Sequence, residues 1–189
     1  NQTLSNTIDK IDLNLIYKAA NEIESTIKRK KTIYVCGNGG SFAIANHYIC
    51  DYFKGLGSQT NLKIKIKSLC SDNELISAIS NDISHDDIFV FQAEKYLEKG
   101  DLLILISSSG NSNNIKKVLK YANSMKIKSI GFCGFDGGYL KKKCSIVIHS
   151  KIDNYGISED INHILMHLIM HYIKLKNLKK NINNKKIIL

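Results

Sequence analysis

The chain has 189 residues, of which 43% are hydrophobic and 23% are charged, a composition typical of one globular domain and not of a disordered chain. The absence of proline and the low count of 12 glycines exclude a collagen-like or linker-rich architecture, and no segment approaches the roughly 18 apolar residues of a membrane span. The formal net charge of +10 comes from scattered lysines, with Arg29 as the single arginine, which favours anionic small molecules over a specific nucleic-acid site.

The first part of the chain predicts two helices around a strand. Residues 1–9 lack the basic-then-apolar layout of a secretory signal. Apolar residues then recur at helical spacing over 14–28. The β-branched run at 32–35 predicts a short strand, and a Gly-rich turn at 37–40 leads into a second predicted helix over 41–53.

The middle of the chain continues the alternation. Isoleucine and lysine alternate over 63–68, which is typical of a half-exposed strand. Residues 73–79 predict a helix, and 86–97 predict a helical or irregular segment. The continuous apolar run at 102–106 predicts a strand that is buried on both faces.

The last third repeats the same order of elements. A helix is predicted over 113–125, a buried strand over 129–133, a further strand over 145–149 and a long helix over 157–175. The Lys/Asn-rich tail at 176–189 is expected to be frayed.

Strands and helices that alternate in this way predict an α/β fold, a doubly wound (flavodoxin-like) parallel sheet flanked by helices. Neither an internal repeat nor a linker interrupts the pattern. We therefore expect a single domain over 1–189, with its core at about 13–175. In such sheets, ligands bind beyond the carboxyl ends of the strands.

Two loops at predicted strand ends carry a chemical signature. The first reads CGNGGS over 36–41. Its glycines permit close approach of a ligand to the backbone, and Ser41 can cap a helix whose first N–H groups favour an anion. The second reads ISSSGNS over 106–112 and brings four hydroxyls to a helix N-terminus. Plain turns explain each loop alone, but two such loops at adjacent strand ends favour a phosphate site.

Two helices carry histidines at metal-binding spacing. His47 and Asp51 are four residues apart, so they share one helix face and can share a metal ion. On the last helix, Glu159, His163 and His167 also recur every four residues. Glu159 and His167 are about 12 Å apart along an ideal helix, so His163 with His167 is the easier local pair. Packing of these rings against apolar neighbours is the alternative.

The motifs CGNGGS with the following histidine at 47, ISSSGNS at 106–112 and FCGFDGG at 132–138 together resemble the sugar isomerase (SIS) fold over about 13–174. The nearest branch is phosphoheptose isomerase, which converts sedoheptulose 7-phosphate to heptose 7-phosphate for surface-polysaccharide (lipopolysaccharide) synthesis. The resemblance implies an enzyme, an isomerase of the intramolecular oxidoreductase class. Its reaction is metal-assisted proton transfer next to a carbonyl, through an enediolate.

The resemblance also implies roles for individual residues. It implies substrate contacts from Asn38, Gly39, Gly40, Ser41, Asp51, Asn81, Asp82, Ser107, Ser108, Ser109, Ser112 and Glu159. It implies one zinc ion per subunit, held by His47, Asp51, Glu159 and His167, with Asp51 as the base and His167 as its acid/base partner. Two positions depart from the branch, since Asp51 stands in place of a glutamate and Glu159 in place of a glutamine. The shorter Asp51 retracts its carboxylate by about 1.5 Å, and Glu159 adds a negative charge.

The expected partners are a phosphorylated sugar and further copies of the chain, with neither a membrane nor nucleic acid. The long predicted helices over 14–28 and 157–175 have apolar stripes, which favours a homo-oligomer, and the resemblance implies a tetramer with sites at subunit interfaces. A second hypothesis is a non-catalytic phosphosugar-binding or replication-initiator-associated SIS protein. Such a protein needs only the serine loops, so His47, Asp51 and His167 together favour the enzyme.

The five cysteines show no short paired spacing, and neither a CxxC nor a zinc-ribbon pattern occurs. Cys36 and Cys133 lie at the ends of predicted strands, where a free cysteine behaves as a small hydrophobic residue. We therefore expect free thiols and a reducing, cytoplasmic compartment.

Overall fold

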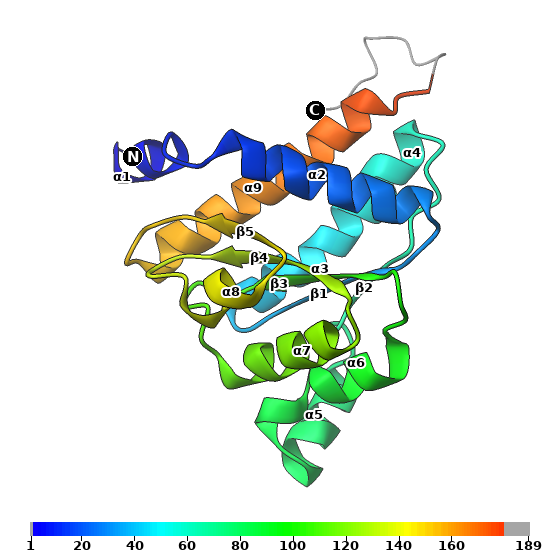
Figure 1. Ribbon diagram of the computed structural model, residues 1–189, viewed down its shortest axis with the longest axis vertical. Helices are drawn as coiled ribbons and strands as arrows, with labels where there is room; N and C mark the ends of the chain where they lie inside the picture. Colours follow the sequence, from blue (N-terminus) through cyan, green and yellow to red (C-terminus); the bar gives the residue numbers. More distant parts are fainter. Residues whose placement is uncertain (1, 180–189) are drawn as a thin grey trace.

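A five-stranded parallel sheet forms the centre of the computed structural model, which describes residues 2–179 (Figure 1). The strand order is β2-β1-β3-β4-β5, and all four neighbouring pairs are parallel. The strands are β1 (Ile33–Gly37), β2 (Ile66–Ser68), β3 (Leu102–Ile106), β4 (Lys128–Cys133) and β5 (Ile146–His149). This order confirms the predicted flavodoxin-like arrangement.

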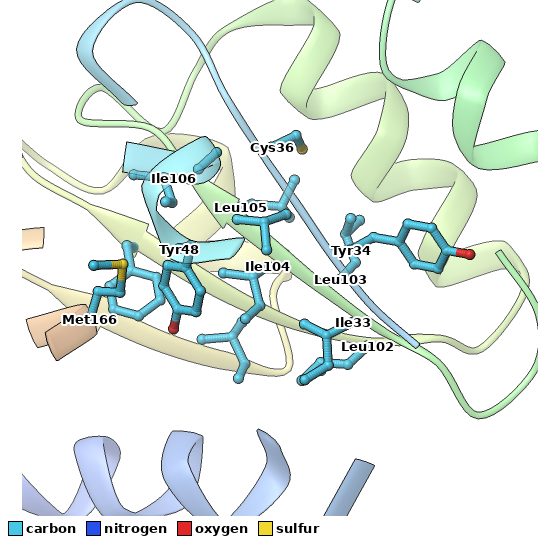
Figure 2. Packing of buried hydrophobic residues seen from close by; sticks show 14 of the residues in the cluster. Ile33, Tyr34, Cys36, Tyr48, Leu102, Leu103, Ile104, Leu105, Ile106 and Met166 are labelled. Atoms are coloured by element: carbon cyan, nitrogen blue, oxygen red, sulfur yellow. The ribbon is translucent and has the colours of Figure 1, made fainter. Parts of the chain in front are cut away.

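The central strands are buried along their whole length because helices cover both faces of the sheet. Every residue of β1 and β3 is buried, which explains the continuous apolar run at 102–106. Figure 2 shows Ile104 of β3 in one cluster with Tyr48 and Met166, which come from helices on the same side of the sheet.

The helices form two layers. On one side, α2 (Leu13–Lys28) packs on α9 (Tyr155–Lys176), and α3 (Gly40–Cys50) lies between α9 and the sheet (Figure 1). On the other side lie α5 (Asn73–Asp82), α6 (Val90–Tyr96) and α7 (Asn113–Ser124), with a 3-10 turn, η2 (His85–Asp87), before α6. The described chain contains no helix with the length and apolar content required to cross a bilayer.

The structure differs from the sequence prediction at four elements. The second predicted helix ends as α3 at Cys50 and continues as a π-helix, η1 (Asp51–Leu56), then a short α4 (Gly57–Gln59), because a widened turn leaves no mark in apolar spacing. The strand expected over 63–68 is confined to β2, the part that pairs with β1. Helix α1 (Gln2–Ile8) buries no residue fully and packs only Leu4 and Ile8 against the core, a pair too short to predict a helix. Helix α8 (Gly138–Lys143) follows a glycine and is only six residues long.

The topology places the two predicted loops side by side. Gly37 at the end of β1 is in register with Ile106 at the end of β3, so the segments 36–41 and 106–112 leave the same edge of the sheet. Helix α9 begins nearby, where the Asn154 side chain accepts a hydrogen bond from the Ile157 N–H at 3.0 Å. Most of the tail expected to be frayed, residues 180–189, lies outside the described residues.

Candidate functional site

A pocket of about 250 Å³, here called the serine pocket, opens where β1 and β3 end. It is formed by both loops and by the first turns of α9. Its lining residues are Asn38, Gly39, Gly40, Ser41, Ser107, Ser108, Ser109, Ser112, Tyr155 and Glu159. Sequence reasoning had named all of these except Tyr155, which packs against Phe135 with ring centroids 4.7 Å apart. An exposed aromatic residue at a helix start gives no signal in the sequence.

The two helices that follow the glycine and serine loops, α3 and α7, lack a side-chain cap at the serine pocket. The N-cap of α3 is Gly39, with φ of 57°, so Ser41 is the second residue of the helix and not its cap as expected. The N-cap of α7 is Ser112, whose hydroxyl makes no capping bond. In the described structure, the N–H groups of the first two residues of both helices are therefore left for a ligand, whereas the Ile115 N–H of α7 donates to Asn114 Oδ1 at 2.9 Å. Helix N-termini favour anions.

The loop 107–112 is held in a tight arrangement against the turn 134–138. Gly110 has a φ of 63°, and a Cβ atom there would collide with the carbonyl of Gly137. The Ser108 carbonyl also accepts a hydrogen bond from the Gly134 N–H at 2.7 Å. This contact explains why the glycine-rich FCGFDGG segment accompanies the serine loop.

The Ser108 hydroxyl has no hydrogen-bond partner in the described structure, although Ser108 is only 4% exposed and lines the serine pocket. A buried polar atom without a partner is rare, because it costs free energy unless a ligand or water satisfies it. Among the described residues that line the pocket, none is a lysine or arginine. The pocket therefore suits a phosphate held by hydroxyls and backbone N–H groups.

A reciprocal pair of amides joins the two loops. The Asn38 Nδ2 donates to Asn114 Oδ1 at 2.8 Å, and the Asn114 Nδ2 donates to Asn38 Oδ1 at 2.9 Å. Asn114 is 2% exposed and also lies 3.5 Å from His85 Nε2. Asn114 is thus a positioning residue that sequence reasoning missed, and the Asn-Asn pair after the serine loop was the available signal.

Two predicted substrate contacts lie outside the serine pocket. Asn81 and Asp82 are exposed at the end of α5, and the Asn81 Nδ2 donates to Asp82 Oδ1 at 2.8 Å. Asn81 lines a separate surface recess on α5. Within one chain, the structure does not bring this pair to the serine loops.

Further along α3 and α9, histidines surround one carboxylate. Asp51 Oδ2 lies 2.7 Å from His167 Nε2 and 3.3 Å from His47 Nε2. The two imidazole nitrogens are 3.4 Å apart. The His163 ring completes the cluster, with its centroid 4.8 Å from that of His47 and 4.7 Å from that of His167. Asp51 is the first residue of the π-helix, and widened turns of this kind frequently occur at functional sites.

The cluster fits a zinc ion in its chemistry and spacing. Imidazole and carboxylate suit zinc, and tetrahedral Zn–N bonds place ligand atoms roughly 3.3 Å apart. Burial lowers the pKa of His163, and the neighbouring His167 and His47 lower it further, which favours the neutral imidazole that metal ligation requires. Its Nε2 is buried and has no hydrogen-bond partner among the described residues.

Glu159 lies apart from the other three predicted metal ligands. Its carboxylate rests directly against Gly40 at the start of α3 and lines the serine pocket, whereas His47 is seven residues further along α3. The structure therefore brings together His47, Asp51 and His167, and it places Glu159 with the serine loops. A second cavity of about 440 Å³ is lined by Asp51 and His167 together with Lys54, His171 and Lys174.

Comparison with known proteins identifies relatives over most of the chain. The SIS domain family matches residues 1–134. A phosphoheptose isomerase from Aliarcobacter butzleri is 39% identical over 129 residues, which cover 68% of each chain. One from Nitratiruptor is 36% identical over 160 residues, which cover 82% of this chain and 84% of the relative. The structure of a phosphoheptose isomerase from Neisseria gonorrhoeae is similar with a TM-score of 0.83, at 25% identity and 91% coverage of both chains.

Proposed function

The chain belongs to the SIS domain family, in its phosphoheptose isomerase branch, and from this membership we propose that it interconverts sedoheptulose 7-phosphate and a heptose 7-phosphate. The observation that carries the proposal is the serine pocket, where the buried Ser108 hydroxyl has no partner among the described residues. Helices α3 and α9, which line this pocket, also hold His47 and His167 of the cluster around Asp51. A phosphate cradle with an acid/base group in reach is what an isomerase of phosphorylated sugars needs.

The serine pocket takes the phosphate. Hydroxyls of the loop 107–112 and the first N–H groups of α3 and α7 converge on it. Because these donors are neutral, the long-range attraction of the anion comes from the net charge of +10 of the chain. Asn38, fixed by Asn114, faces the same ligand. Asn81 and Asp82 stay proposed substrate contacts.

Asp51 and His167 transfer the protons. In the reaction, a base removes the proton from the carbon next to the carbonyl and returns it to the neighbouring carbon, while a second group moves a proton between the two oxygens. His167 Nε2, 2.7 Å from Asp51 Oδ2, holds that carboxylate and can exchange a proton with it. His47 holds the same oxygen from the opposite helix. A zinc ion bound by His47, Asp51 and His167 would supply polarisation of the substrate oxygens.

The direct test is conversion of substrate by the purified protein. A panel of ketose and aldose phosphates of five to seven carbons is incubated with the protein in deuterated water, and NMR follows both the product and the exchange of the C1 and C2 hydrogens. Conversion with exchange supports the proposal. Tight binding of the same compounds without conversion or exchange would instead identify a non-catalytic phosphosugar-binding protein.

The proposal also covers the oligomeric state of the protein and the cellular compartment in which it works. Exposed apolar side chains on α2 and α9, among them Leu13, Tyr17 and Leu168, form a surface suited to a second copy of the chain, and we infer a homotetramer. All five cysteines are unpaired, which supports a reducing compartment, the cytoplasm. There the product would feed the synthesis of heptose for surface lipopolysaccharide.

A further inference from the structure

The histidine cluster contains three imidazoles, one more than the sequence assigned to the metal. In the described chain, His47, His163 and His167 form one group of potential metal ligands, whose ligand atoms all lie within 4.8 Å of one another. Rotation of imidazole rings about χ2 is soft. A small rotation therefore brings these atoms to the roughly 3.3 Å spacing of a tetrahedral zinc site.

His163 has an unsatisfied nitrogen in this cluster. Its Nε2 is buried and has no hydrogen-bond partner in the described structure. The ring is fixed by stacking on His167, at an interplanar angle of 27°, and by an edge contact with His47. A buried imidazole nitrogen without a partner costs free energy. A metal ion among the three rings would satisfy it.

Glu159 has a different environment. Helices α3 and α9 run in the same direction here, since Glu159 contacts Gly40 while His167 contacts His47 and Asp51. Glu159 lies about 6 Å before His163 along the axis of α9. Its carboxylate lines the serine pocket, where it can accept hydrogen bonds from sugar hydroxyls.

We propose that His163 is the fourth protein ligand of the metal site, with His47, Asp51 and His167, and that Glu159 contacts the sugar instead of the metal. This inference rests on the metal-assisted isomerase proposed above. It assigns the two negative groups different tasks. Asp51 belongs to the metal and to proton transfer, and Glu159 selects the polyhydroxyl part of the substrate.

The test measures zinc affinity in three variants. Metal-free protein is titrated with zinc in competition with a chromophoric chelator. We expect His163→Ala to weaken zinc binding about tenfold or more, and Glu159→Gln to leave the affinity unchanged. His171→Ala is the matched control, because His171 lies on the same helix and also has a buried ring nitrogen without a partner, Nδ1, but does not belong to the cluster. It should bind zinc like the wild type.

Two further readouts separate ligation from folding. Cobalt replaces zinc, and the d–d absorption bands report the ligand set. The bands should change in His163→Gln and stay the same in Glu159→Gln. Zinc should raise the melting temperature of the wild type by mass action, and this rise should be lost in His163→Ala, whose metal-free form melts like the metal-free wild type.

The outcomes distinguish this inference from the proposed function. Loss of zinc in Glu159→Gln with retention in His163→Ala would overturn it, and so would a wild type that binds no zinc. Isomerisation is measured separately on metal-free protein. Conversion of substrate by the metal-free protein would therefore support the isomerase activity and contradict the role proposed for the metal. Glu159→Gln should keep its zinc and show a changed KM for the sugar phosphate.

Discussion

At the residue scale, the proposed recognition of phosphate rests on the hydroxyls of the loop 107–112, because no basic side chain among the described residues lines the serine pocket. We expect the double variant Ser107→Ala, Ser109→Ala to bind sedoheptulose 7-phosphate at least about tenfold more weakly, since a hydrogen bond to a charged group contributes about 1.5–3 kcal/mol. Isothermal titration calorimetry measures the affinity. Ser124→Ala is the control, because the Ser124 hydroxyl donates only to the Tyr121 carbonyl on α7. Unchanged binding in the double variant would exclude this loop as the phosphate site.

In the proposed mechanism, the chemical step depends on Asp51. Its Oδ2 is shared by His47 and His167, so Asp51→Asn removes both the base and the charge that holds the two rings. We expect kcat to fall about 100-fold or more, while phosphosugar affinity at the serine pocket stays unchanged. Steady-state kinetics measure kcat, and calorimetry measures the phosphosugar affinity. Asp87→Asn, which affects only a surface pair with Lys117, should retain full activity, and retained activity in Asp51→Asn would remove Asp51 from the mechanism.

The residues that sequence reasoning placed correctly are those whose position depends on local order along the chain. The serine loop and the CGNGGS loop each follow a buried strand, so parallel pairing alone brings them to one edge. The choice between Glu159 and His163 depends on how far α9 is shifted along α3. That shift depends on how the two helices pack over the sheet, where Tyr48 and Met166 belong to the same buried cluster, and periodicity does not reveal it.

At the scale of elements, long amphipathic helices and buried strands were predictable, and irregular turns were not. Helices α2, α7 and α9 begin within two residues of their predicted starts, because an apolar stripe repeats over several turns. The π-helix at Asp51 follows α3 without a change in the pattern of apolar and polar residues, so the sequence predicts one continuous helix. Asp51 nevertheless stays on the same face as His47, and this explains why the i, i+4 argument for that pair succeeded.

An ionic anchor joins α2 to the end of α9. The Glu24 carboxylate is 2% exposed and accepts hydrogen bonds from Lys28, Lys176 and Asn177. Burial alone raises the pKa of Glu24, but the hydrogen bonds from Lys176, Lys28 and Asn177 outweigh it and lower the pKa from 4.5 to about 2. The stabilisation is therefore complete above pH 4.5 and is lost as the pH falls toward 2.

We expect Glu24→Gln to lower the free energy of unfolding at pH 7 by about 1–3 kcal/mol. The difference between variant and wild type should shrink as the pH falls below 4.5. Urea unfolding at pH 7 and pH 3 measures both values. Glu98→Gln, whose side chain is 79% exposed and 3.6 Å from Lys31, should change stability little at either pH. A Glu24→Gln deficit that is independent of pH would contradict the ionic origin of the anchor.

At the scale of the whole molecule, the sheet is covered on both faces, yet the layer of α2 and α9 still has an apolar outer surface. Leu13 is 60% exposed and Leu175 is 51% exposed, and Tyr17 meets Tyr172 at a centroid distance of 5.3 Å, which places the two helices side by side. Ile164 and Leu168 extend the same stripe along α9, next to His163 and His167. A second copy that covers this stripe would therefore also shield the proposed metal site from water.

We expect light scattering to give the mass of a homotetramer for the wild type at micromolar concentration. The double variant Leu13→Glu, Leu175→Lys should dissociate, because it places charges in the apolar stripe. Each new charge also suits its helix end, with the acid at the start of α2 and the base at the end of α9, so the subunit should still fold. Ile83→Glu is the control, since Ile83 is 55% exposed beside α5, away from α2 and α9 (Figure 1). A monomeric wild type would refute the homo-oligomer. An oligomer that persists in the double variant and dissociates in Ile83→Glu would place the interface elsewhere.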